Sequence, residues 1–193
     1  EGIASAHDIV RFKHPIAPED VVPDALPRTL WLDEVDGMAL TAYAQDDSAA
    51  LRFTHAGLVK TLALDGSTVT VTWQGSGLAG RRFTTRLNLA MPSCDGFLGR
   101  YVLADGHIPG GFGQPIDLPA ATALTLEDGV LGGGIRLVAS IPARICGRPQ
   151  HTVSQSEAGF EKIMQCVELS FMWTLPDDPF TLQLQLTIQP SPP

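Results

Sequence analysis

The sequence predicts an all-β fold, a large antiparallel β-sandwich. The clearest sign is the stretch 180–188, where Phe, Leu and Ile alternate strictly with Thr and Gln. A two-residue period of this kind is typical of a strand that buries one face and exposes the other. About ten such segments, separated by Gly, Pro and Asp turn signals, are more than one open sheet usually holds. We therefore expect two packed sheets with a shared apolar core.

The chain opens with a segment that lacks this period. Residues 7–13 (HDIVRFK) can form one or two helical turns, but prolines stop any continuation: Pro15, Pro18, Pro23 and Pro27. We therefore predict a short irregular or helical lead-in over residues 1–36, which links the chain to a preceding domain. The β-sandwich then occupies residues 37–189, and residues 190–193 form a frayed proline-rich tail.

The predicted strands follow in chain order: 51–55, 58–64, 68–73, 83–91, 99–103, 121–126, 134–140, 143–146, 167–175 and 180–188. Between them, Asp65-Gly66 and Asp128-Gly129 are dipeptides that favour tight hairpin turns. The glycine run 132–134 also joins two strands, because it lacks the G-K-[ST] ending of a phosphate-binding loop and leads into a strand. Trp73 and Trp173 fall on the apolar side of their strands, so we expect both in the core.

Composition and charge exclude several classes of protein. The 193 residues are 44% hydrophobic and 18% charged, which is typical of a folded globular domain. A net charge of −8 repels polyanions, so we expect no nucleic-acid partner. No apolar run reaches the roughly 18 to 20 residues of a membrane helix, so we expect no membrane partner.

The cysteines indicate the compartment. Cys94, Cys146 and Cys166 have neither the even count of a disulfide framework nor the spacing of a zinc site. They fit a reducing environment, and we expect a cytoplasmic protein. The N-terminus carries no secretory signal. Because the sequence starts at Glu1 without methionine, we also expect it to be an excised piece of a longer polypeptide, which leaves open whether a leader lies upstream.

Catalytic groups are not evident. A serine nucleophile needs a G-x-S-x-G elbow, which is absent, and the five histidines stand singly along the chain. Glycosidase chemistry needs two carboxyl groups facing each other across a sugar, and spacing alone identifies no such pair. We expect three adjacent acidic pairs to be solvated loop charges: Asp33 with Glu34, Asp46 with Asp47, and Asp177 with Asp178. We therefore predict no catalytic residue, no metal ligand and no cofactor.

A few side chains are candidates for carbohydrate binding: Trp31, Tyr101, Arg82, Arg86 and Asn88. The two aromatic residues offer flat apolar faces that can pack against sugar rings. The other three share one face of the predicted strand 83–91 with Thr84. This polar row can hydrogen-bond sugar hydroxyls, or it can pair with acids on a neighbouring strand or another domain. We favour the second role.

The most specific motif is the stretch 154–165 (SQSEAGFEKIMQ), directly before the predicted strand 167–175. Weaker motifs are spread over the rest of the chain: 11–15 (RFKHP), 28–33 (RTLWLD), 60–62 (KTL) and 87–89 (LNL). Together they resemble the C-terminal β-sandwich domain of family 57 glycoside hydrolases, the α-amylase and 4-α-glucanotransferase group.

The resemblance implies a galactose-mutarotase-like supersandwich packed beside a catalytic barrel domain of the same polypeptide. The family's catalytic carboxylates lie in that barrel, so the implied function is a non-catalytic accessory domain of an α-glucan-processing glycoside hydrolase or 4-α-glucanotransferase. Its implied role is to brace the barrel, with α-glucan as a further candidate partner. Two departures from the family pattern weaken the case for sugar binding: Glu34 stands where the family has His, and Arg86 stands where it has an acid.

Two other functions remain open at this point. One is a free-standing carbohydrate-binding module. The other is an aldose-epimerase-like enzyme on the same fold, which needs a general acid and a general base on the concave sheet. The sequence shows no obvious pairing of a histidine with a carboxylate for that reaction.

Overall fold

The computed structural model describes residues 15–45, 51–94, 96–156 and 159–190. In these residues the chain forms a 13-stranded, fully antiparallel sheet and one short 3-10 helix, η1 (Pro18–Val21). The strands are β1 (Leu30–Val35), β2 (Met38–Ala39), β3 (Ala44–Gln45), β4 (Leu51–His55), β5 (Leu58–Asp65), β6 (Thr68–Gly75), β7 (Arg82–Leu89), β8 (Gly99–Leu103), β9 (Gly110–Gly111), β10 (Ile116–Asp128), β11 (Gly133–Ser156), β12 (Gly159–Thr174) and β13 (Phe180–Pro190). The same residues contain no helix with the length and apolar character needed to cross a membrane.

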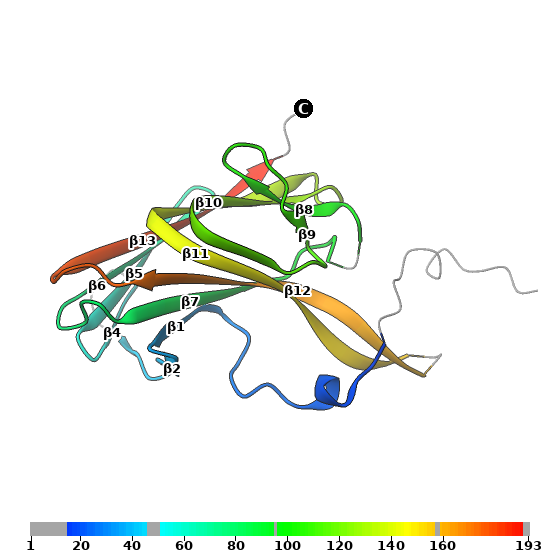
Figure 1. Ribbon diagram of the computed structural model, residues 1–193, viewed down its shortest axis with the longest axis horizontal. Coiled ribbons are helices and arrows are strands. Elements are labelled where there is room, and N and C mark those ends of the chain that lie inside the picture. The colour runs from blue at the N-terminus through cyan, green and yellow to red at the C-terminus, as the bar shows by residue number, and fades with distance from the viewer. Residues whose placement is uncertain (1–14, 46–50, 95, 157–158, 191–193) are drawn as a thin grey trace, which may run out of the picture.

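The sheet divides into two layers around β11. Residues 133–139 of this strand pair with β13, whereas residues 144–156 pair with β12. One layer therefore runs β2-β1-β7-β12-β11, and the other runs β11-β13-β6-β5-β4-β3. β10 pairs with β11 on both sides of the point where β11 passes from one layer to the other, and β8 and β9 extend the sheet beyond β10 (Figure 1). The predicted antiparallel sandwich is confirmed, with both layers belonging to one continuous sheet.

The two layers bury their apolar sides against each other. The ring of Trp73 on β6 lies 5.4 Å from that of Phe83 on β7 and 6.3 Å from that of Trp173 on β12, centroid to centroid. Because neither β7 nor β12 pairs with β6, these contacts cross from one layer to the other. Trp73 is 0% exposed and Trp173 is 4% exposed, which confirms the predicted core positions. Burial of each such side chain contributes about 1.5–3 kcal/mol.

β4 and β8 begin and end where they were expected, whereas β12 begins at Gly159, well before the predicted strand 167–175, and β10 extends beyond the predicted 121–126 at both ends. The predicted strands 134–140 and 143–146 are parts of the single long strand β11. Pro142 separates them in the sequence, and the pairing register between β10 and β11 shifts at this point. A proline lacks the backbone N–H needed for a regular ladder, so it is tolerated at such an irregularity.

The strand β1 lies within the range 1–36 that the sequence assigns to the lead-in, and it pairs along its length with β7. Its alternation is hard to detect because the register shifts between Leu30 and Leu32, and Trp31 between them has a φ of +64°. An irregularity of this kind breaks the two-residue rhythm. The helical turns expected at residues 7–13 lie outside the described residues, as do residues 191–193 of the expected tail.

Candidate functional site

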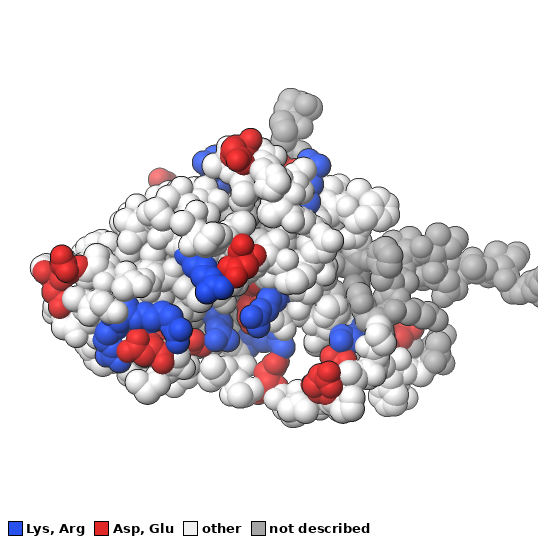
Figure 2. Space-filling model, in the orientation of Figure 1, with Lys and Arg blue, Asp and Glu red and all other residues white. Residues whose placement is uncertain are grey.

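The outer face of the layer β1-β7-β12-β11 carries the predicted polar row. Successive side chains of β7 point alternately into and out of the sandwich, so Phe83 and Leu87 are buried while Arg82, Arg86 and Asn88 face outward. The three outward residues therefore share one surface, as the period of the strand predicts. In Figure 2, basic and acidic side chains lie interleaved over the middle of the face that is turned toward the viewer.

A groove of about 310 Å³ runs across this face. We call it the arginine groove; its charged lining residues are Glu34, Arg82, Arg86, Arg148 and Glu168. Three guanidinium groups and two carboxylates leave a local excess of one positive charge, although the whole chain carries −8. Guanidinium groups can donate paired hydrogen bonds to carboxylate oxygens and single ones to hydroxyls.

Within the groove, Arg86 is held by an acid on the neighbouring strand. Its terminal Nη2 lies 2.9 Å from Oε1 of Glu34 on β1, and the Glu34 side chain is only 7% exposed. This is the pairing that we favour for the polar row. The Nε atom of Arg86 is buried and has no hydrogen-bond partner within the described chain. Arg86 therefore keeps one unused donor beneath the groove.

The other members of the polar row make different contacts. Asn88 donates a hydrogen bond from Nδ2 to the carbonyl oxygen of Thr29 at 3.1 Å. Arg82 is exposed, and its side chain forms no ion pair with any described residue. The nearby Arg81 instead pairs with Asp36 at 2.7 Å, and this hydrogen bond lowers the pKa of the Asp36 carboxyl.

Tyr101 is wrong as a sugar-binding candidate, because its side chain is 0% exposed. It lies on the inner side of β8, opposite Leu126 of β10, and packs edge-on against Phe112 with 5.5 Å between ring centroids. Burial raises the pKa of its hydroxyl, which has no hydrogen-bond partner in the described part of the chain. A large aromatic side chain gains more from this core position than from solvent.

Trp31 also stands apart from the polar row. Its indole is half-buried and packs against the core, with its ring centroid 6.2 Å from that of Trp73. The structure therefore brings Arg82, Arg86 and Asn88 onto one surface and places both aromatic candidates elsewhere.

Asp33 and Glu34 were expected to be solvated loop charges, and this expectation is wrong: they are 0% and 5% exposed. Asp33 lies on the inner face of β1. Its Oδ1 accepts a hydrogen bond from Thr85 Oγ1 at 2.7 Å, and its Oδ2 accepts from Tyr43 OH at 2.6 Å. Desolvation of a carboxylate is costly, and such donors are what make its burial possible.

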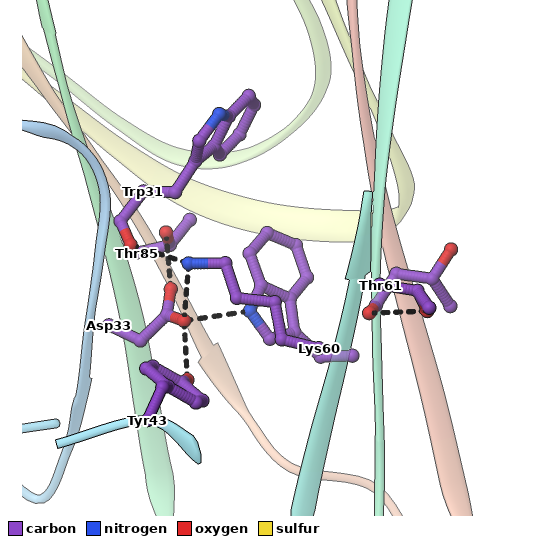
Figure 3. Close-up of polar contacts among 8 residues, drawn as sticks. Trp31, Asp33, Tyr43, Lys60, Thr61 and Thr85 are labelled. Carbon is purple, nitrogen blue, oxygen red and sulfur yellow. Dashed lines mark hydrogen bonds and ion pairs between the residues drawn. The ribbon is translucent and has the colours of Figure 1, made fainter. Parts of the chain in front are cut away.

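Lys60 supplies the opposite charge. Its Nζ lies 2.9 Å from Asp33 Oδ2, and it donates to the carbonyl oxygen of Trp31 at 2.6 Å (Figure 3). Trp73 Nε1 adds a further hydrogen bond to the same Oδ2 at 3.0 Å. Burial, together with the charge of Asp33, raises the pKa of Tyr43. These residues form the buried cluster, which is closed to substrate and is structural in character.

The buried cluster lies where the two edges of the sheet, β2-β1 and β4-β3, come together. β2 and β3 are the terminal strands, and residues 40–43 connect them. Asp33 belongs to one layer and Lys60 to the other, so their ion pair bridges the layers at this seam. The sequence contained a signal for this ion pair. Asp33 is two residues from Val35, and Lys60 is two residues from Leu58 and from Leu62, so each charged residue shares a strand face with apolar residues. Two opposite charges on inner faces predict a buried pair.

The described residues contain no group of three or more His, Cys, Asp or Glu that could hold a metal ion. The arginine groove supplies hydrogen-bond donors and two acids, and its acid Glu34 is already committed to Arg86. Such an arrangement can bind hydroxyl or carboxylate groups of a partner.

Comparison with known proteins identifies the relatives of this chain. A family model described as "Alpha-amylase/4-alpha-glucanotransferase, C-terminal" matches residues 43–186. The crystal structure of 4-alpha-glucanotransferase from Thermococcus litoralis superposes with a TM-score of 0.59 at 16% identity, covering 90% of this chain and 30% of that one. The Slr1438 protein from Synechocystis sp. PCC 6803 gives a TM-score of 0.39 at 14% identity, covering 82% of this chain and 65% of that one. No curated protein matches the sequence.

Proposed function

The chain belongs to the family of alpha-amylase/4-alpha-glucanotransferase C-terminal domains, and from this membership we propose that it is a non-catalytic accessory domain of an α-glucan-processing enzyme. The observation that carries the proposal is the match to Thermococcus 4-alpha-glucanotransferase, of which this chain spans only 30%. A likeness that covers so small a share of an enzyme favours one module of a larger polypeptide. The catalytic part of that polypeptide is the proposed partner.

Bracing of the catalytic part is the role that the surface supports best. Interfaces between domains of one chain are typically more polar than obligate subunit interfaces. The arginine groove combines the Arg86–Glu34 ion pair with the exposed guanidinium groups of Arg82 and Arg148, and such a surface can pair with acids of another domain. The same donors are the ones that an α-glucan would meet, so contact with glucan is the second part of the proposal.

Product analysis and calorimetry test these two parts separately. The purified chain is incubated with maltooligosaccharides, and the products are separated by chromatography beside those of the complete polypeptide that carries the domain. We expect products only from the complete polypeptide; shorter or longer glucans made by the isolated chain would overturn the non-catalytic role. Heat of binding on titration of the isolated chain with maltooligosaccharides, lost in Arg86→Met, would favour a carbohydrate-binding module over a purely bracing domain.

A further inference from the structure

β11 and β12 continue beyond the sandwich as a two-stranded ribbon. The last residue of β11 that pairs with β10 is Gly147, and the first residue of β12 that pairs with β7 is Val167. From there to the turn, as far as the chain is described, the two strands pair only with each other. Figure 1 shows this ribbon projecting at lower right, away from β4, β5 and β6. An isolated two-stranded ribbon is marginally stable in water and needs packing against another element.

Within the described chain, the lead-in contacts the ribbon. Lys162 on β12 pairs with Asp20 of η1, Nζ to Oδ1, at 2.7 Å. This hydrogen bond, together with one from the backbone N–H of Ala17, lowers the pKa of the Asp20 carboxyl. One 3-10 turn without a buried residue covers little apolar surface. The apolar side chains that stay exposed beside it can meet a partner.

The uncovered surface is a groove of about 760 Å³ between the lead-in and the ribbon. We call it the ribbon groove. Its large exposed apolar residues are Ile16, Val21, Val22 and Phe160, which are 42%, 65%, 68% and 69% exposed. Phe160 lies two residues from Lys162 on β12 and therefore on the same ribbon face. Four large apolar side chains gathered around one groove mark an interaction surface.

We propose that the ribbon groove is the docking surface for the catalytic part of the same polypeptide. The inference rests on the proposed function and specifies where the two parts meet. Ile16 and residues 19–24 of the lead-in form one wall of the groove, and the ribbon forms the other. This chain covers 30% of the matched glucanotransferase. The remaining part of such an enzyme belongs to the same polypeptide, and it is the partner that we infer for the groove. Attachment keeps the local concentration of such a partner high.

The partner surface has a predictable chemistry. The centre of the ribbon groove requires an apolar patch, because the exposed residues there are valine, isoleucine and phenylalanine. On its rim, Asp20 and Asp24 are already paired with Lys162 and Arg28, whereas Glu19 has no ion pair with a described residue. We therefore expect an apolar patch with a basic side chain facing Glu19.

Hydrogen exchange measured by mass spectrometry tests the docking surface. Amide exchange is compared between the chain of 193 residues and the complete polypeptide that carries it. In the complete polypeptide, we expect the exchange rates of the amides of residues 16–24 and 148–165 to fall by a factor of roughly ten or more. In that same polypeptide, Phe160→Ser should restore fast exchange in these segments. Phe97→Ser is the matched control, because Phe97 is 82% exposed and lines a different groove.

The possible outcomes separate this inference from the proposed function. Protection of residues 82–88 and 144–148 alone would place the contact at the arginine groove, overturning the ribbon-groove assignment while leaving the bracing role intact. No added protection anywhere in the domain would overturn both. Equal effects of Phe160→Ser and Phe97→Ser would also contradict the assignment, and this comparison holds even if the isolated chain folds poorly.

Discussion

Lys60 Nζ lies 2.9 Å from Asp33 Oδ2, with the two side chains 8% and 0% exposed. The pair bridges the two layers at the seam between the ends of the strand order, where Tyr43, Trp73 and Thr85 also donate to Asp33. A buried charge that loses its partner leaves an uncompensated desolvation cost. The stability of the domain therefore depends on this contact more than on its surface ion pairs.

Replacement of Lys60 tests the buried cluster. Lys60→Met leaves the Asp33 carboxylate buried without its counter-charge, so the free energy of unfolding should fall by about 3–5 kcal/mol. Arg81→Gln is the control, since the Arg81–Asp36 pair is 39% and 45% exposed and is screened by solvent, so its loss should change the free energy of unfolding far less. Urea denaturation followed by tryptophan fluorescence measures both. Similar losses for the two variants would contradict the dependence on the buried pair.

Replacement of Gly99 by alanine tests the packing that buries Tyr101 and Phe112. A Cβ atom at Gly99 would lie 2.1 Å from Cδ2 of Phe112, whose side chain is fully buried. Gly99→Ala should therefore lower the free energy of unfolding by about 1–3 kcal/mol. Gly113→Ala is the matched control, because a Cβ atom at Gly113 would meet no other atom within 4 Å. An unchanged denaturation midpoint for Gly99→Ala would show that this core is looser than described.

The Asp117 carboxyl should titrate far below its ordinary range. Hydrogen bonds from Arg144, at 2.9 and 2.6 Å, hold the pKa of Asp117 at about 2, against an ordinary value of 3.8. Because the folded pKa is depressed, the stabilising contribution of this group is complete above the unfolded pKa and is lost as the pH falls from about 4 to about 2. Carboxyl chemical shifts followed by NMR measure the pKa, which should return close to its ordinary value in Arg144→Gln. A wild-type midpoint near the ordinary value would contradict the pairing.

Sequence patterns predicted most of the fold because burial of one strand face imposes a two-residue period. β13 shows this rhythm from Phe180 to Leu186, and β6 shows it around Val71 and Trp73, whereas the irregularity at Trp31 hides it in β1. The pairing order of the strands, and the way β11 passes from one layer to the other, arise from contacts far apart in the chain. Local periodicity carries no information on such contacts.

The candidate site was predicted in part for the same reason. The strand period placed Arg82, Arg86 and Asn88 on one face, and the structure brings them to one surface. Tyr101 failed as a candidate because its exposure depends on β10 and Phe112, which only the tertiary fold places beside it. The strand period places Asp33 on the inner face of β1, but its hydrogen-bond donors come from four other segments that only the tertiary fold brings beside it.

Heat inactivation of the complete polypeptide is the most direct test of the bracing role. Conversion of maltooligosaccharides is measured after incubation at rising temperatures, for the unmodified polypeptide and for its Lys60→Met and Arg81→Gln variants. If this domain supports the catalytic part, Lys60→Met should lose activity at a temperature lower by roughly 5 °C or more, in step with unfolding of the domain, while Arg81→Gln changes little. Full activity of the Lys60→Met polypeptide at temperatures where this domain has already unfolded would contradict that role.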